Sequence, residues 1–128
     1  MSALSDYLED ELLDHILSVG SYTMPTNVYV GLSTGSFADD NSGTELTGNN
    51  YARVAATFSA ASGGATSNSS AIEFAAATGS WGSISHFGIF DAASSGNLLI
   101  HGAFTTAKTI ASGDILKIPT GDLDITAA

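Results

Sequence analysis

The 128-residue chain contains no cysteine, and its only basic side chains besides histidine are Arg53, Lys108 and Lys117. Without cysteine the protein forms no disulfide, and neither a thiolate metal site nor a cysteine nucleophile is available. The three basic residues face 13 Asp and Glu, which gives a formal net charge of −10. Because this charge repels phosphate backbones and anionic lipid headgroups, we expect no nucleic-acid partner and no membrane partner.

Charged side chains of either sign are scarce as well. They make up 12% of the residues, whereas a typical soluble domain has roughly 25%. The surface must therefore consist largely of Ser, Thr, Asn, Gly and Ala, which suits a protein packed against others, or an extracellular particle, better than a cytosolic enzyme. No apolar run approaches the roughly 20 residues of a membrane-spanning helix, and we recognise no signal peptide at the N-terminus.

The first 20 residues contain the only predicted helix. Its apolar side chains recur at spacings of three and four residues: Leu4, Leu8, Leu12, Leu13, Ile16 and Leu17. This spacing predicts one broad apolar stripe, on a helix that is capped by Ser2 or Ser5 and ends at Gly20. The outer face of the helix is acidic, and we expect it to be either solvated or a docking face for a basic partner.

Residues 81–104 hold most of the large apolar side chains and predict two β-strands joined by a turn at residues 91–97. In the first strand, Trp81, Ser83, Ser85, Phe87 and Ile89 are predicted to point to one face, and Ile84, His86 and Phe90 to the other. Bulky side chains on both faces predict a strand that is covered on both sides. Gly88 and Gly102 lie inside the strands, where glycine predicts a bulge or the close approach of another backbone.

Further strands are predicted at residues 27–33, 51–58, 72–74, 115–118 and 123–125, and residues 105–110 are predicted to continue extended after the second central strand. Residues 34–50 form a long polar loop, and residues 59–70 a flexible, low-complexity connection. The pattern predicts a mainly β fold, an antiparallel β-sandwich or barrel of about seven or eight short strands, with one N-terminal α-helix covering one face or end. The length predicts a single domain over residues 1–128, with the helix in residues 1–20 and the β-sandwich in residues 22–128.

Two groups of side chains offer metal ligands, but we expect no bound metal and no cofactor. The acidic loop at residues 39–45 offers oxygen donors, yet its ligand spacing is shorter than that of an EF-hand and no flanking helices are predicted. A solvated or interface loop is the favoured interpretation. His86 and His101 are predicted to lie opposite each other within one position of register, but a zinc site needs a third ligand, and none is evident.

The sequence contains no recognisable catalytic constellation, so we expect no enzymatic activity. No serine lies in a G-x-S-x-G turn, no His and Asp are arranged to activate one, and no glycine run precedes a helix to bind phosphate. Arg53, the only arginine, is predicted to hold a buried or interfacial carboxylate through a bidentate pair. The candidate interface residues are Tyr7, Asp10, Asp14, Asp39, Asp40, Arg53, His86 and His101.

The chain contains, in order, the segments LSDYLEDELLDHIL, VYVGLSTG, NNYARVAATF, SGGATSNSSAIEFAAATGSWGSISHFGIFDAASSGNLLIHGAF and SGDILKIPTGDLDIT. The most specific part is the pattern YAR…F…WG…HFGIFDA…GNLL. This order resembles that of small structural proteins of tailed bacteriophage virions, which are described as tail-fibre proteins, head decoration (cement) proteins or virion structural proteins. The family has no catalytic motif that could be carried over to this chain.

The resemblance implies a capsid decoration protein that binds the assembled capsid surface and stabilises it by mass action. It implies the major capsid protein and further copies of the chain, as a homotrimer, as partners. It also implies synthesis in the host cytoplasm and a place on the capsid surface of the virion. The alternative is a tail-fibre or baseplate module for adhesion to the host surface, in which Trp81, Tyr51 and Tyr22 would be aromatic platforms for glycans. For Trp81, a place in the core is the other explanation.

Overall fold

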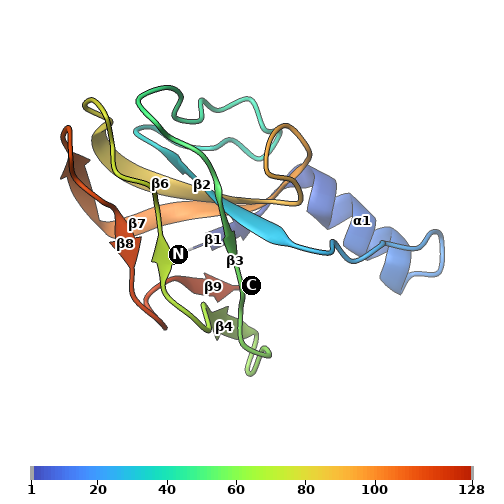
Figure 1. Cartoon of the computed structure of the whole chain (residues 1–128). Helices are drawn as coiled ribbons and strands as arrows, with labels where there is room; N and C mark the ends of the chain where they lie inside the picture. Colours follow the sequence, from blue (N-terminus) through green and yellow to red (C-terminus); the bar gives the residue numbers. More distant parts are fainter. Residues whose placement is uncertain (1, 128) are drawn as a thin grey trace.

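The computed structural model describes residues 2–127 and has one helix and nine strands in this part of the chain (Figure 1). In chain order the elements are β1 (Ser2–Leu4), α1 (Asp6–Ile16), β2 (Val28–Ser33), β3 (Val54–Ala56), β4 (Ala65–Ser67), β5 (Ile72–Glu73), β6 (Gly82–Phe90), β7 (Leu98–Ile110), β8 (Lys117–Ile118) and β9 (Asp124–Thr126). The fold is mainly β, as predicted. Within residues 2–127, no helix has the length and apolar character needed to cross a membrane.

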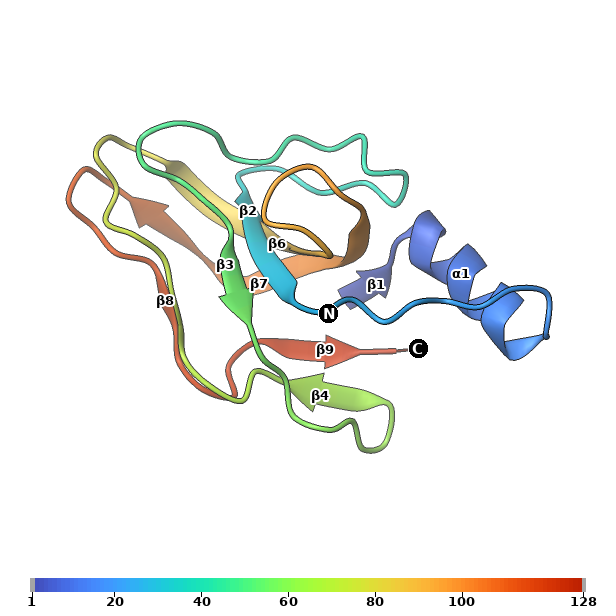
Figure 2. The same ribbon diagram turned by 45° about the vertical axis from the view of Figure 1, so that its right-hand side comes forward.

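Five strands form one antiparallel sheet in the order β1-β7-β6-β2-β3, and the other four form two antiparallel pairs, β4-β9 and β5-β8. In Figure 2, β4 and β9 lie below the large sheet, and the main hydrophobic core lies between the layers. Its side chains come from β2 and β6 on one side and from β5, β8 and β9 on the other: Val30, Leu32, Ile84, Phe87, Ile89, Ile72, Ile118 and Ile125. The sheets are not closed into a barrel, so the sandwich is the correct one of the two predicted architectures.

The predicted central hairpin is present as β6 and β7, joined by the turn at residues 91–97. Residues 98–110 form one continuous strand, so the extended continuation predicted for residues 105–110 is confirmed. The pairing of β6 with β7 shifts register between Ile84 and His86. This shift lets Ile84 enter the same core as Phe87, so the opposite face predicted for Ile84 is wrong, because strict alternation of side chains ends at a bulge.

β6 buries bulky side chains on its other face as well, as predicted. Phe90 packs there with Phe37 and Leu98 in a second, smaller core, and the rings of Phe37 and Phe90 meet edge to face with centroids 5.6 Å apart. A Cβ atom at Gly88 would lie 3.0 Å from side-chain atoms of both Leu98 and Phe90. Gly88 therefore marks a close approach of side chains, whereas Gly102 is paired in regular register and no bulge falls there.

The N-terminal segment contains less helix than predicted. Ser2–Leu4 forms β1, an edge strand paired with β7, and α1 spans only Asp6–Ile16. Of the two predicted caps, Ser5 is the N-cap, and its hydroxyl accepts the Leu8 N–H at 3.2 Å. Edge pairing satisfies the backbone of residues before the cap, so the helix starts later than the apolar spacing suggested.

The helix ends at Ile16, so the prediction that it ends at Gly20 is wrong. Ser18 adopts the left-handed conformation with φ of 63°, and the carbonyl of Asp14 accepts the N–H groups of Val19 at 2.8 Å and Gly20 at 3.1 Å. These bonds close the C-terminal turn. A single left-handed residue is enough for such a closure, and here it is a serine that precedes the expected glycine.

The Ser-rich segment at residues 59–70, predicted to be flexible, is part of the sandwich. It contains β4 (Ala65–Ser67), paired with β9, and the buried residue Asn68. The side-chain amide of Asn68 donates to the carbonyls of Ser70 at 2.8 Å and Pro119 at 3.0 Å. Polar composition therefore predicted flexibility wrongly, because the polar groups bind one another and the backbone.

Candidate interaction surface

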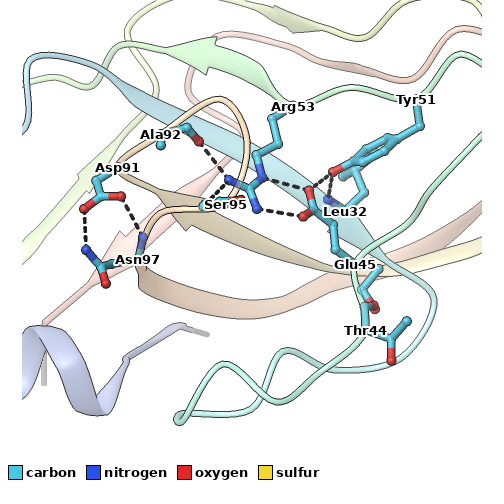
Figure 3. A network of polar contacts seen from close by, with 10 residues as sticks. Leu32, Thr44, Glu45, Tyr51, Arg53, Asp91, Ala92, Ser95 and Asn97 are labelled. Carbon is cyan, nitrogen blue, oxygen red and sulfur yellow. Dashed lines mark hydrogen bonds and ion pairs between the residues drawn. The ribbon is translucent and has the colours of Figure 1, made fainter.

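Arg53 binds one carboxylate in the bidentate geometry that the sequence predicts (Figure 3). Its Nε donates to Oε2 of Glu45 at 2.9 Å, and Nη2 donates to Oε1 at 2.8 Å. Nη1 donates to the carbonyls of Ala92 and Ser95, both at 2.8 Å, and the guanidinium carbon lies 3.5 Å from the centre of the Phe90 ring. Only 7% of the Arg53 side chain is exposed, so this residue is an internal anchor.

Tyr51 completes the network at the edge of β2. Its hydroxyl donates to Oε2 of Glu45 at 2.5 Å and accepts the Leu32 N–H at 2.9 Å. β3 pairs with β2 only as far as Val54, so the Tyr51 hydroxyl satisfies the β2 backbone beyond the end of β3. A Cβ atom at Gly31 would lie 2.8 Å from Oε2 of Glu45 and 3.0 Å from the Tyr51 hydroxyl, so the network needs glycine at position 31.

The network fixes two loops that are far apart in sequence. The predicted long loop at residues 34–50 contributes Glu45, and the buried Phe37 holds the first half of this loop against the sheet. In the turn at residues 91–97, the carboxylate of Asp91 accepts the backbone N–H of Asn97 at 2.7 Å and its side-chain amide at 3.0 Å. Both loops are thereby held in fixed positions on the sandwich.

Tyr51 gives the fold an alkaline pH dependence. Burial, and next the hydrogen bond to Glu45, raise the pKa of Tyr51 well above its ordinary value of about 10. Below about pH 10 the phenol is protonated in both states and contributes no pH dependence. Above that pH the unfolded chain loses the proton while the folded chain keeps it, so stability falls by about 1.4 kcal/mol per pH unit from this group.

We expect Tyr51→Phe to remove this part of the alkaline loss of stability. The measurement is the free energy of unfolding in urea at several values from about pH 9 to about pH 11. Tyr7→Phe is the matched control, because it removes a far more exposed phenol and should keep most of the slope. A Tyr51→Phe variant with the same slope as the unmodified protein would contradict the prediction.

Two of the three aromatic platforms predicted for glycans are internal. Trp81 is buried, and its indole N–H donates to the carbonyl of Asn49 at 2.9 Å. The Tyr51 ring meets Trp81 edge to face at 5.7 Å and stacks on Phe74 at 6.3 Å. These two rings are not free to bind a sugar, so the platform prediction is wrong for both and the core explanation of Trp81 is confirmed. Tyr22 alone of the three is partly exposed without such packing.

α1 is attached to the sandwich mainly through its first turns. The N–H and hydroxyl of Ser5 donate to backbone carbonyls of β7, and the Asp6 N–H donates to the carbonyl of Asp39 at 3.0 Å. Leu8 is the only buried residue of the helix. From this attachment α1 projects away from the sheets (Figures 1 and 2). The prediction that the helix covers a face or end of the sandwich is therefore wrong for most of its length.

The outer end of α1 and the segment after it expose large apolar side chains. This apolar tip consists of Leu13, Ile16, Leu17, Val19 and Met24, whose exposed fractions run from 57% to 81%. The first three belong to the predicted stripe, and their spacing of three and four residues places them on one face of the helix. Exposed apolar side chains that gather in one place mark a surface for binding another molecule.

The same helix is strongly acidic. Its acidic flank consists of Asp6, Glu9, Asp10, Glu11 and Asp14, and α1 contains no Lys or Arg. Within residues 2–127, none of these five carboxylates forms an ion pair. The predicted interface residues Tyr7, Asp10 and Asp14 thus lie on the projecting helix.

The remaining acidic candidates lie on the long loop. Oδ1 of Asp39 is 2.5 Å from Nε2 of His101, and a carboxylate oxygen of Asp40 accepts the Ser42 N–H at 2.9 Å. Hydrogen bonding to the side chain of Ser42, and next to its backbone N–H, lowers the pKa of Asp40. Glu45 belongs to the arginine network. Because these carboxylates point to different partners, they do not converge on one point. Among residues 2–127, no group of three or more His, Asp or Glu is arranged to hold a metal ion.

His86 and His101 are two positions apart in register, so the predicted offset of at most one is wrong. An extra residue, Leu99, enters β7 where the register shifts, and His101 consequently pairs with Gly88 while His86 pairs with Ala103. Each imidazole has its own partner, since Nδ1 of His86 lies 2.7 Å from the hydroxyl of the preceding serine and His101 contacts the long loop.

Two features of the surface were not predicted from the sequence. Glu45 was not identified as the partner of Arg53, although it is the last acid before that arginine and lies eight residues away. The exposure of the apolar tip was also missed. A detectable signal was present, because Val19 and Met24 continue the apolar character beyond the end of the helix.

Comparison with protein families identifies a family that matches almost the whole chain. A family model described as "Podophage GP4 fiber I protein gp80" matches residues 3–126. The match covers the projecting helix, the long loop and all strands of the sandwich except the first residue of β1. No curated protein shows significant similarity to the chain.

Proposed function

The chain belongs to the family of the podophage GP4 fiber I protein gp80, and from this we propose that it is a non-enzymatic structural module of a bacteriophage tail fibre. It is a phage virion structural protein, in agreement with the resemblance of its sequence. The observation that carries the fibre proposal is the match to a fibre protein over residues 3–126. Under this proposal the protein acts by holding neighbouring subunits of the virion together.

The structure supports a scaffolding role through the contrast between its two parts. The sandwich is fixed internally by the network around Arg53, whose side chain is 7% exposed. α1 projects from it with an acidic flank and with an apolar tip whose side chains are 57% to 81% exposed. A rigid body with a protruding amphipathic helix is suited to docking into a groove on another subunit. Glycan adhesion through Trp81 and Tyr51 is not part of the proposal.

The fibre proposal predicts a low copy number in the virion. Quantitative mass spectrometry of purified virions, with the major capsid protein as the internal standard, gives the number of chains per particle. A fibre module is expected in a small number set by the symmetry of the tail, far below the number of capsid subunits. A copy number close to parity with the capsid subunit would overturn the fibre proposal. Absence from the particle would do the same.

Capsid decoration, with the major capsid protein as partner, stays a prediction that the same experiment separates from the fibre role. A decoration protein covers the capsid lattice, so its copy number follows that of the capsid subunit. It would also bind expanded capsids that lack it and raise their resistance to heat, because a ligand that binds only one state stabilises that state. Capsids without the protein are the control in this binding experiment.

A further inference from the structure

We propose that the apolar tip of α1 in one copy docks into a lysine-flanked groove on a second copy of the same chain, forming a head-to-tail contact. The groove has a volume of about 260 Å³ and lies between β7 and the segment around β8. We define this lysine groove by Ile84, Phe104, Lys108, Leu116, Lys117 and Pro119. The inference goes beyond the proposed function, since it concerns the contact itself and holds for a fibre or a capsid location.

Charge selects this groove as the partner of α1. The chain has only three Lys and Arg residues, and Arg53 is held by Glu45 inside the protein. The other two, Lys108 and Lys117, are exposed and flank the groove. Neither forms an ion pair within residues 2–127. The two free positive charges of the described chain therefore border one apolar depression, and the acidic flank of α1 is their complement.

The groove also matches the apolar tip in chemistry. Leu116 is buried at its floor and Phe104 is partly exposed, while the aliphatic stems of the lysines extend its walls. Asp122 lies among the lining residues and Glu73 is the cross-strand neighbour of Lys117, but neither carboxylate forms an ion pair with a lysine within residues 2–127. The volume is below the roughly 300–1,000 Å³ of sites that enclose drug-sized ligands. Side chains of a docked helix are a better occupant than a free small molecule.

A contact between two α1 helices face to face is disfavoured by the same charges. Each copy would bring five carboxylates and no Lys or Arg from its helix, and like charges at close range repel. In Figures 1 and 2 α1 and β8 lie at opposite ends of the molecule, so the tip and the groove of one copy are both free to engage different neighbours. Such a heterologous contact closes into a ring or continues as a filament. A three-membered ring would be the predicted homotrimer.

The test uses the full chain in sedimentation velocity at increasing protein concentration. The tip variant carries Leu13→Ser and Ile16→Ser. The groove variant carries Lys108→Glu and Lys117→Gln, with glutamine at 117 because a glutamate there would face Glu73 across the β5–β8 pair. The unmodified chain is expected to assemble. The tip variant loses two apolar side chains and should associate roughly 100-fold more weakly, since burying one is worth about tenfold or more in affinity. The groove variant should be weakened to a similar degree, because it removes both positive charges and places a carboxylate against the acidic flank.

The decisive measurement is the mixture of the two variants. The tip variant keeps its groove and the groove variant keeps its tip, so together they form one complete contact. The mixture is expected to give a one-to-one complex that does not grow further. Ile115→Ser, which removes an exposed apolar side chain that does not line the groove, and Ala60→Glu with Ala61→Glu, which adds negative charge elsewhere, are the controls and should assemble normally.

Three outcomes would overturn the inference. They are an unmodified chain that stays monomeric at every concentration, a groove variant that assembles like the unmodified chain, and a mixture that forms no complex although the unmodified chain assembles. Because all substituted side chains are exposed, far-UV circular dichroism and the thermal midpoint verify that each variant is folded. The copy number in the virion tests the fibre role separately, so failure of one proposal is distinguishable from failure of the other.

Discussion

Replacing Arg53 by methionine is expected to destabilise the protein by about 3–5 kcal/mol and to lower its thermal midpoint by roughly 12–20 °C. Methionine keeps an apolar stem against Phe90, so the loss comes from the guanidinium. The Glu45 carboxylate, 23% exposed, would remain without its cation, and the carbonyls of Ala92 and Ser95 would lose their donor. Breaking such a pair is strongly destabilising because it leaves an uncompensated charge in a largely desolvated place.

A double-mutant cycle separates this coupling from general disruption. Glu45→Gln alone removes the charge but leaves an amide beside the guanidinium, and the double variant removes both charges. The cost of the double variant should fall below the sum of the single costs by about 1–3 kcal/mol, measured as free energies of unfolding in urea. Lys108→Met is the matched control, because Lys108 is exposed and without an ion pair within residues 2–127, and it should change stability by no more than about 0.5 kcal/mol. Additive costs at positions 45 and 53 would contradict the prediction.

This network indicates how far the sequence alone could go. A single arginine in an acidic chain predicts a bidentate carboxylate pair, and that prediction is confirmed. The sequence could not say which of 13 acidic residues is the partner. That choice depends on the path of the loop at residues 34–50, which is set by burial of Phe37 and by the Tyr51 hydroxyl at the edge of β2. Long-range packing of this kind leaves no periodic signal in the chain.

The helix illustrates a different limit. Spacings of three and four residues correctly predict an amphipathic helix, but an apolar stripe predicts only that something covers it. Leu8 is covered by the sheet of the same chain, whereas Leu13 and Ile16 one to two turns later are exposed. A stripe that a neighbouring subunit covers has the same sequence pattern as one covered intramolecularly. The direction in which α1 leaves the sandwich decides between them, and it is fixed by the bonds of Ser5 to β7.

Strand register was predicted only approximately for a related reason. The turn at residues 91–97 and the two central strands are recognisable from turn residues and alternating bulk. The bulge that inserts Leu99 is not, because a bulge adds one residue without changing composition. It moves His101 to a position opposite Gly88 and ends the expected pairing of the two histidines. Ile84 changes face at the other register shift in the same hairpin.

The Ser-rich segment at residues 59–70 contains the second residue whose removal is expected to have a large effect. Asn68 is 1% exposed and makes three side-chain hydrogen bonds. Besides its bonds to the carbonyls of Ser70 and Pro119, its Oδ1 accepts the Leu123 N–H at 2.9 Å. It thereby joins the end of β4 to the segment between β8 and β9, which no strand pairing connects directly.

Asn68→Ala is expected to cost about 2–4 kcal/mol, because it leaves a buried N–H and buried carbonyls without partners and each such group costs about 1–3 kcal/mol. The thermal midpoint should fall by roughly 8–16 °C, and hydrogen exchange of the β4 and β9 amides should accelerate more than that of β6. Asn50→Gly is the control, since Asn50 is exposed, its amide makes a single bond to the carbonyl of Ala76, and glycine tolerates the φ of 68° at this position. It should cost no more than about 1 kcal/mol. An equal loss of unfolding free energy at positions 50 and 68 would contradict the prediction. It would mean that residues 59–70 contribute little to the stability of the sandwich and behave as the flexible connection that their composition predicts.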